Sequence, residues 1–226
     1  MKLKVLVIVV VCMGVLIGYA HTENFLDDKD IEKAAKIYGD DAKLRLNEWQ
    51  KLIYKSQAKS RTEMQRLGDV NQFFNQLTFI DDVKLWGLED YWATPIEFIG
   101  AKGGDCEDFS IAKYFTLREL GVSDEKIRLI YVKALSLDQF HMVVAYYPEP
   151  SSIPYILDNI DPDMKLATQR EDLVPIYSFN AQHLWLMKER GRGQLTGKST
   201  RLSKWTLMRD RYSRGDLKVP AIRLSY

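Results

Sequence analysis

The chain has 226 residues, of which 46% are hydrophobic, and its 32 basic and 31 acidic residues give a formal net charge of +1. This length and composition allow one domain with a substantial core, and we find no repeat or low-complexity tract. Because the charges nearly balance, we expect no nucleic-acid partner.

The first twenty residues have the pattern of a secretory signal peptide. Lys2 and Lys4 precede an apolar run from Val5 to Ile17, and residues 18–20 offer a small-x-small cleavage site. The apolar run is short for a membrane span, so an uncleaved anchor is the weaker alternative. Cleavage would leave residues 21–226 as a single domain with 30 basic and 31 acidic residues, a net charge of −1. We therefore expect an exported protein.

Helices are predicted in the first half of the chain. A capping-box spacing with proline at the first helical position marks one helix start, at Thr94-Pro95-Ile96-Glu97. Apolar residues recur at helical spacing over four segments, which are residues 30–57 with a break at Gly39, 61–77, 94–100 and 110–120. The fourth segment predicts a helix that buries one face. Residues 79–92 between them read as a loop.

Strand patterns follow in the second half, over residues 126–134, 140–147 and 154–160. The short intervals between them favour antiparallel pairing. Helices followed by a sheet indicate the α+β class. The last part of the domain, about residues 188–226, is basic, and an amphipathic helix is expected around residues 202–212. We interpret this segment as a solvated face, and we rank binding to a membrane surface or an acidic partner below that interpretation.

A short stretch, Gly103-Gly104-Asp105-Cys106-Glu107-Asp108, lies directly before the fourth predicted helix. Cys106 falls in the first turn of that helix, where free backbone N–H groups and the helix dipole favour a thiolate, the nucleophilic form. The two glycines allow a sharp turn and a close approach of substrate. A purely structural interpretation also fits, in which Asp105 caps the helix and Cys106 is a small buried filler.

The signal peptide contains the other cysteine, Cys12, so a cleaved chain would keep Cys106 alone. Such a chain can form no internal disulfide. A lone thiol risks oxidation in an oxidising compartment, so its presence is easier to explain if the chemistry requires it. This favours the catalytic interpretation.

His141 and Asp158 lie on neighbouring predicted strands, where both can meet a cysteine at a helix start. In that arrangement His141 takes the thiol proton of Cys106 and later returns it to a leaving group, while Asp158 fixes the imidazole tautomer. The backbone N–H of Cys106 is a natural oxyanion donor. His183 is a competing base, which we rank below His141 because no suitably placed acid follows it on a strand.

Five short motifs occur in one order, namely Gly104-Asp105-Cys106-Glu107-Asp108, Ala112-Lys113-Tyr114, Leu120-Gly121-Val122, His141-Met142-Val143 and Leu157-Asp158-Asn159. Their combination resembles the bacterial transglutaminase-like cysteine proteinases, and among them the LapG-type periplasmic proteases that release biofilm adhesins. The resemblance implies a papain/transglutaminase-like fold, with the nucleophile at a helix N-terminus packed on an antiparallel sheet. It also implies a triad of Cys106, His141 and Asp158.

The resemblance further implies a calcium-dependent enzyme with metal ligands beside the nucleophile. The matching acidic positions are Asp105, Glu107 and Asp108. Carboxylate oxygens suit Ca²⁺, but its shell of six to eight oxygens needs backbone carbonyls and water as well. The alternative is that these acids only cap the helix.

By the same resemblance, the substrate is the N-terminal region of a large surface adhesin, cut at a pair of alanines. Small residues at the scissile bond suit a narrow groove lined by aromatic side chains. Trp86, Tyr91 and Trp92 are candidates for that lining, although a place in the core fits them equally well. The implied inhibitory partner is an inner-membrane receptor for cyclic di-GMP.

The sequence therefore predicts a calcium-dependent periplasmic cysteine endopeptidase. Two alternatives stay open. A transglutaminase would use the same three residues but transfer the acyl group to an amine. A non-catalytic calcium-binding interaction module would not need Cys106 at all.

Overall fold

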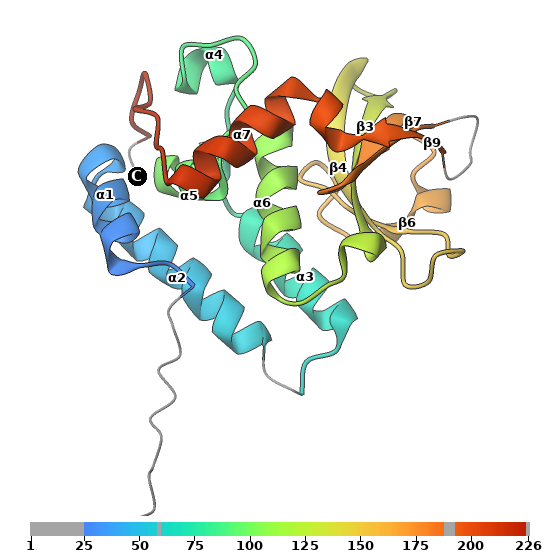
Figure 1. Cartoon of the computed structure of the whole chain (residues 1–226), viewed down its shortest axis with the longest axis horizontal. Helices are drawn as coiled ribbons and strands as arrows, with labels where there is room; N and C mark the ends of the chain where they lie inside the picture. The colour runs from blue at the N-terminus through green and yellow to red at the C-terminus, as the bar shows by residue number, and fades with distance from the viewer. Residues whose placement is uncertain (1–24, 58–59, 188–192, 225–226) are drawn as a thin grey trace, which may run out of the picture.

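The computed structural model describes residues 25–57, 60–187 and 193–224. Helices gather on one side and a seven-stranded sheet lies on the other, so the predicted α+β class is confirmed (Figure 1). The predicted signal peptide, residues 1–20, lies outside the described residues. Within the described ranges no helix has the length and apolar character that a bilayer span requires.

The N-terminal half forms the predicted helices. Gly39, with a φ of 97°, separates the first two helices, and Thr94 closes a reciprocal capping box with Glu97. A short helix inside the predicted loop was not expected. The helices are α1 (Asp28–Tyr38), α2 (Asp40–Ser56), α3 (Glu63–Phe74), α4 (Asp82–Leu85) and α5 (Pro95–Ala101).

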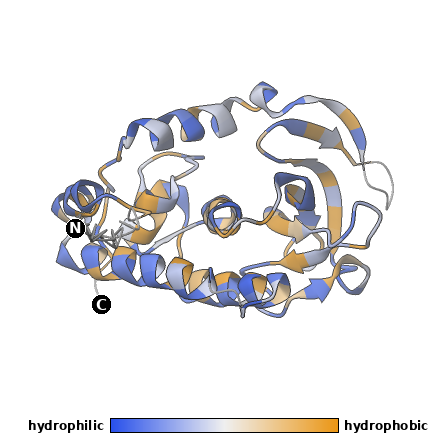
Figure 2. Cartoon of the chain, turned by 60° about the horizontal axis from the view of Figure 1, so that its bottom comes forward, coloured by the Kyte–Doolittle hydropathy of each residue, from blue (hydrophilic) through white to orange (hydrophobic). Residues whose placement is uncertain are grey.

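The next helix, α6 (Cys106–Glu119), runs through the middle of the molecule (Figure 1). Its buried residues lie on every side of the helix, not on the single face that the sequence predicted. The other helices and the sheet enclose it, and their apolar positions face inward (Figure 2). A helix in that position is buried all round because both layers pack against it.

A two-stranded parallel pairing fixes where α6 begins. β1 (Thr78–Phe79) pairs with β2 (Gly103–Gly104), which immediately precedes the N-cap residue Asp105. A Cβ atom on Gly103 would overlap the carbonyl oxygen of Thr78, so this approach requires glycine.

The sheet is antiparallel throughout, in the order β6-β5-β4-β3-β7-β8-β9. All three predicted strands are present, as β3, β4 and β5. The strands are β3 (Ile127–Ala134), β4 (Gln139–Tyr146), β5 (Tyr155–Leu157), β6 (Lys165–Leu166), β7 (Leu173–Phe179), β8 (His183–Leu186) and β9 (Gln194–Lys198).

Both faces of the sheet are covered. One face carries Leu129, Met142 and Val144 into the main core with the helices. The opposite face carries a smaller set of buried residues, which we call the second core cluster: Ile130, Val132, Val143, Ala145, Tyr147 and Ile156. Residues alternate between these faces because side chains of a strand point to opposite sides.

The basic C-terminal segment is part of the domain where the structure describes it; residues 188–192 lie outside the described ranges. Helix α7 (Ser203–Arg214) confirms the expected amphipathic helix, with Trp205 and Met208 buried. After α7, the Lys218 amide donates to the buried Glu97 carboxylate at 2.8 Å. The segment therefore anchors itself on the helical layer as well as presenting its charges to solvent.

Candidate active site

Cys106 is the first residue of α6 and its thiol is half-buried. The N-cap residue Asp105 makes no capping hydrogen bond with its side chain, so capping does not account for its presence. The Cys106 thiol donates to Glu107 Oε2 at 2.7 Å. Burial and the neighbouring charges of Glu107 and Asp105 raise the pKa of this thiol, whereas the Met142 amide lowers it.

The start of α6 lies against the edge of β4 beyond the paired part of β5. The amide of Met142 acts on the Cys106 sulfur, and its carbonyl accepts a hydrogen bond from Ser110 Oγ at 2.8 Å. β5 pairs with β4 only at residues 144–146, which leaves this part of the edge to the helix. Met142 of β4 thus contacts the helix of the nucleophile, and His141 directly precedes Met142 in the strand.

His141 and Asp158 form a buried pair, 3% and 1% exposed. His141 Nε2 lies 2.7 Å from Asp158 Oδ1. Burial alone would raise the pKa of Asp158, but hydrogen bonds from His141, the Ile160 amide and Arg170 lower it to about 2. An ionised carboxylate only accepts hydrogen bonds, so His141 Nε2 must carry the proton. The basic lone pair of the neutral imidazole is therefore on Nδ1.

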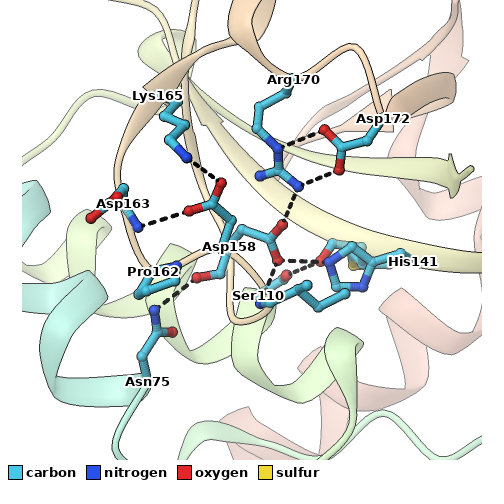
Figure 3. A network of polar contacts seen from close by, with 12 residues as sticks. Asn75, Ser110, His141, Asp158, Pro162, Asp163, Lys165, Arg170 and Asp172 are labelled. Carbon is cyan, nitrogen blue, oxygen red and sulfur yellow. Dashed lines mark hydrogen bonds and ion pairs between the residues drawn. The ribbon is translucent and has the colours of Figure 1, made fainter. Parts of the chain in front are cut away.

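The Asp158 segment is held at several points (Figure 3). Asn75 Nδ2 donates to the Asp158 carbonyl at 2.8 Å, and the Ile160 amide donates to its Oδ1 at 3.0 Å. Arg170 Nη2 donates to Asp158 Oδ2 at 2.8 Å. The acid that orients His141 is thus fixed through both its backbone and its side chain.

Three carboxylates gather near the N-terminus of α6. One oxygen each from Asp82, Asp105 and Asp108 lies within 4.8 Å of the others. Asp82 Oδ1, Asp105 Oδ1 and Asp108 Oδ2 are buried without a hydrogen-bond partner among the described residues. Burial and the charges of Asp108, Glu107 and Asp82 raise the pKa of Asp105 to about 11. Burial and the charge of Glu107 raise the pKa of Asp82 to about 6. Buried oxygens without donors fit a bound cation, which would supply the missing partner.

The predicted metal ligands are divided between two groups. Asp105 and Asp108 belong to the carboxylate cluster, while Glu107 lies with Asp105 and Cys106 and accepts the thiol hydrogen bond. Asp82, at the start of α4, was not predicted. It lies among several other acids in a segment that the sequence predicted as a loop, so no signal could single it out, and only the fold brings it to Asp105.

The three aromatic residues expected to line a groove are wholly or partly buried against the main core. Trp86 and Trp92 belong to the core and are 3% and 7% exposed, so they offer a substrate little surface. Trp92 stacks on Phe179, and half-buried Tyr91 donates to Glu97 Oε1 at 2.6 Å. Trp86 packs against Tyr91 in turn, with ring centroids 5.1 Å apart. His183, the competing base, is exposed on β8. Strands β3 and β7 separate β8 from β4, which carries His141.

Comparison with known proteins gives one family. The family model described as bacterial transglutaminase-like cysteine proteinase matches residues 46–191. The EGTA-treated structure of Legionella pneumophila LapG is 41% identical, covers 82% of this chain and 97% of its own, and has a TM-score of 0.71. A second structure of that protein is 40% identical over the same shares, with a TM-score of 0.70.

The calcium-bound structure of Legionella pneumophila LapG is 41% identical, covers 83% of this chain and 99% of its own, and has a TM-score of 0.69. No curated protein matches the chain. The family match spans more than half of the sequence, and the structural matches cover more than four-fifths of it. The chain belongs to the bacterial transglutaminase-like cysteine proteinases.

Proposed function

We propose that this cysteine protease is a calcium-dependent endopeptidase that uses Cys106, His141 and Asp158 as its catalytic triad. The observation that carries the proposal is the buried His141–Asp158 pair beside the strand edge that meets Cys106. Asp158 accepts the Nε2 proton, so Nδ1 is the nitrogen available to the thiol.

The first half of the reaction forms an acyl-enzyme. His141 Nδ1 accepts the thiol proton as the Cys106 sulfur attacks the scissile carbonyl carbon. The imidazolium then gives this proton to the leaving amine as the C–N bond breaks. Asp158 stays ionised and stabilises the imidazolium, in keeping with the low pKa of its carboxyl group. The Cys106 backbone N–H can donate to the oxyanion.

The second half releases the acyl group to water. His141 takes a proton from the attacking water, the thioester bond breaks, and the proton returns to the Cys106 sulfur. The two halves together hydrolyse one peptide bond and leave the enzyme unchanged.

Calcium would be held by Asp82, Asp105 and Asp108, with Glu107 close by. Each of these three residues has a buried carboxylate oxygen without a hydrogen-bond partner among the described residues, which supports the assignment because hard oxygen donors suit calcium. When bound, the cation would offset negative charge that otherwise opposes ionisation of the Cys106 thiol. One solved structure of Legionella pneumophila LapG is calcium-bound.

The proposed substrate is the N-terminal region of a large surface adhesin, cut at a di-alanine site. The proposed location is the periplasm, supported by the signal-peptide pattern of residues 1–20. The proposed inhibitory partner is the periplasmic domain of an inner-membrane cyclic di-GMP receptor. These three proposals rest on the family resemblance.

The test is cleavage of a recombinant N-terminal adhesin fragment that contains a di-alanine. We expect cleavage in calcium, none in chelator, and recovery when calcium is restored. Cys106→Ala and His141→Ala should abolish cleavage, whereas His183→Ala, a matched change at the exposed histidine, should not. Cleavage by Cys106→Ala would reject the triad.

The alternative acyl acceptor is tested in the same mixture. A labelled primary amine competes with water for the acyl-enzyme. Incorporation of the amine without cleavage would make the protein a transglutaminase.

A further inference from the structure

The connection between β6 and β7 crosses the sheet on the face that carries His141. β6 and β7 are separated in the sheet by β5, β4 and β3, so the chain must pass over these strands. Ala167 and Leu173, near the two ends of the connection, pack against the second core cluster. His141 shares that face with Val143, two residues along β4. The connection is therefore seated over the His141–Asp158 pair.

Arg170 is the side chain that this connection brings to the pair (Figure 3). Its side chain is 4% exposed, and Nη2 donates to Asp158 Oδ2 at 2.8 Å. Nε and Nη2 also donate to the two carboxylate oxygens of Asp172, each at 2.9 Å. The Arg170 amide donates to the Ala167 carbonyl at 3.2 Å, and its own carbonyl accepts from the Leu173 amide at 3.1 Å. Both the backbone and the guanidinium of Arg170 are thus fixed.

The hydrogen bonds divide the Asp158 carboxylate between two tasks. Oδ1 accepts from His141 Nε2 and from the Ile160 amide, while Oδ2 accepts from Arg170. Rotation of the carboxylate would break bonds on both oxygens. Arg170 therefore sets the plane in which Oδ1 meets the imidazole, and Asp172 orients the guanidinium in turn.

Stability alone gives a weak reason for this arrangement. Arg170 Nη1 is buried without a partner in the part of the chain that the structure describes. Burying a charged group with an unpaired donor costs free energy, and apolar residues of similar volume often replace buried ion pairs without loss. The hydrogen bond from Arg170 to Asp158 gives a better reason, because it holds the acid that orients the catalytic base.

We propose that Arg170 is a positioning residue of the protease reaction, which holds Asp158 so that His141 keeps its proton on Nε2 and its lone pair on Nδ1. This inference rests on the proposed triad. Arg170 acts through Asp158 and does not touch the reacting atoms. Lysine at this position would keep the charge but could not form the planar fork with two carboxylates.

The test compares Arg170→Gln and Arg170→Lys in the full protein as secreted. We expect Arg170→Gln to lower kcat on the adhesin fragment by about 10- to 100-fold, as when partners that orient other functional histidines are removed. KM should stay within about twofold, because substrate contacts are unchanged. Arg170→Lys should recover part of kcat.

A matched control separates positioning from stability. Arg66 is a half-buried arginine of α3 that donates to the carbonyls of Ser56 and Leu120, away from the site. Arg66→Gln should lower the melting temperature and leave kcat of the folded protein unchanged. If Arg170→Gln behaves as Arg66→Gln does, Arg170 is structural and the inference is overturned.

Nitrogen-15 NMR of the histidine rings gives a readout that needs no substrate. The ring signals that disappear in His141→Gln are assigned to His141. In the wild type, they should show a single tautomer, protonated on Nε2, with a strongly deshielded proton. Arg170→Gln should lose this proton signal or mix the tautomers. An unchanged His141 signal in Arg170→Gln would overturn the inference. If the wild type cleaves no fragment, the proposed substrate or reaction fails, while the NMR comparison still decides the role of Arg170.

Discussion

The carboxylate of Asp108 lies against Gly104, in the space that a Cβ atom would occupy. Asp108 also accepts a hydrogen bond from the Ala93 amide at 2.7 Å, so one of its oxygens is committed and the other faces the carboxylate cluster. The glycine before the nucleophile thus makes room for a buried acid of the proposed calcium site.

Gly104→Ala should therefore damage the carboxylate cluster. Its Cβ would overlap Asp108 Oδ2, and relieving this overlap costs about 1–3 kcal/mol of the free energy of unfolding. Denaturant titration measures the loss, and the calcium-induced rise in melting temperature should shrink. The matched control is Gly68→Ala in α3, where the Cβ meets Met164 Cε at an ordinary 3.7 Å. That change should stabilise the protein by roughly 0.5–1 kcal/mol; a Gly104→Ala protein as stable as Gly68→Ala would contradict the close packing.

Asp82→Asn should raise stability in chelator and reduce the stabilisation that calcium gives. In chelator, the variant should melt at a higher temperature, because the Asp82 carboxylate opposes ionisation of Asp105 and Asp108 and its removal relieves this repulsion. In calcium, the wild type should gain about 2.7 kcal/mol at a free calcium concentration of 100 times the Kd, and the variant should gain far less. Thermal unfolding in EGTA and in calcium measures both effects.

The neighbouring Asp81 supplies the control for this change. Asp81 is exposed and pairs with Lys84 at 3.4 Å on the surface. Asp81→Asn should melt as the wild type does in both conditions. An Asp82→Asn protein with a full calcium response would remove Asp82 from the site.

Asp158→Asn tests the orientation of His141. Asparagine keeps the size of the side chain but can present an N–H group where the carboxylate accepts a proton, which favours the wrong imidazole tautomer. We expect kcat to fall about 1,000- to 10,000-fold with KM little changed. Steady-state kinetics on the adhesin fragment measures this, with Asp163→Asn, an exposed acid five residues on, as the control. Full activity of Asp158→Asn would exclude Asp158 from the triad.

The same carboxyl group should make stability depend on pH. The pKa of Asp158 is lowered from 3.8 to about 2 in the folded state. A lowered folded-state pKa stabilises the fold above the ordinary pKa, and this contribution is lost as the pH falls from about 4 towards 2. Its size is about 2 kcal/mol.

The measurement is the difference in unfolding free energy between the wild type and Asp158→Asn, taken from pH 7 down to pH 3. We expect the difference to be constant above about pH 5 and to shrink below pH 4. A constant difference over the whole range would mean that Asp158 is not held ionised by its partners.

Local pattern was enough to place the main chemical groups on their elements. Gly103 and Gly104, which were expected to form a sharp turn before Cys106, form the short strand β2 instead. The apolar spacing after Cys106 predicted α6. Alternation predicted the strands that carry His141 and lead to Asp158. These predictions succeed because helix and strand periods, caps and turns depend on residues close together in the chain.

The partners of those groups were decided by packing. Asp82 reaches Asp105 across more than twenty residues, and Arg170 reaches Asp158 through a connection that crosses the sheet. The sequence left both a core position and a groove lining open for Trp86, and in the structure its side chain is buried in the core. Residue patterns were sufficient to predict an α+β chain with a thiol at a helix start, a histidine on one strand and an acid at the next. Which charges are buried together depends on how the helices and the sheet pack around α6, because burial and long-range pairing arise only in the folded chain.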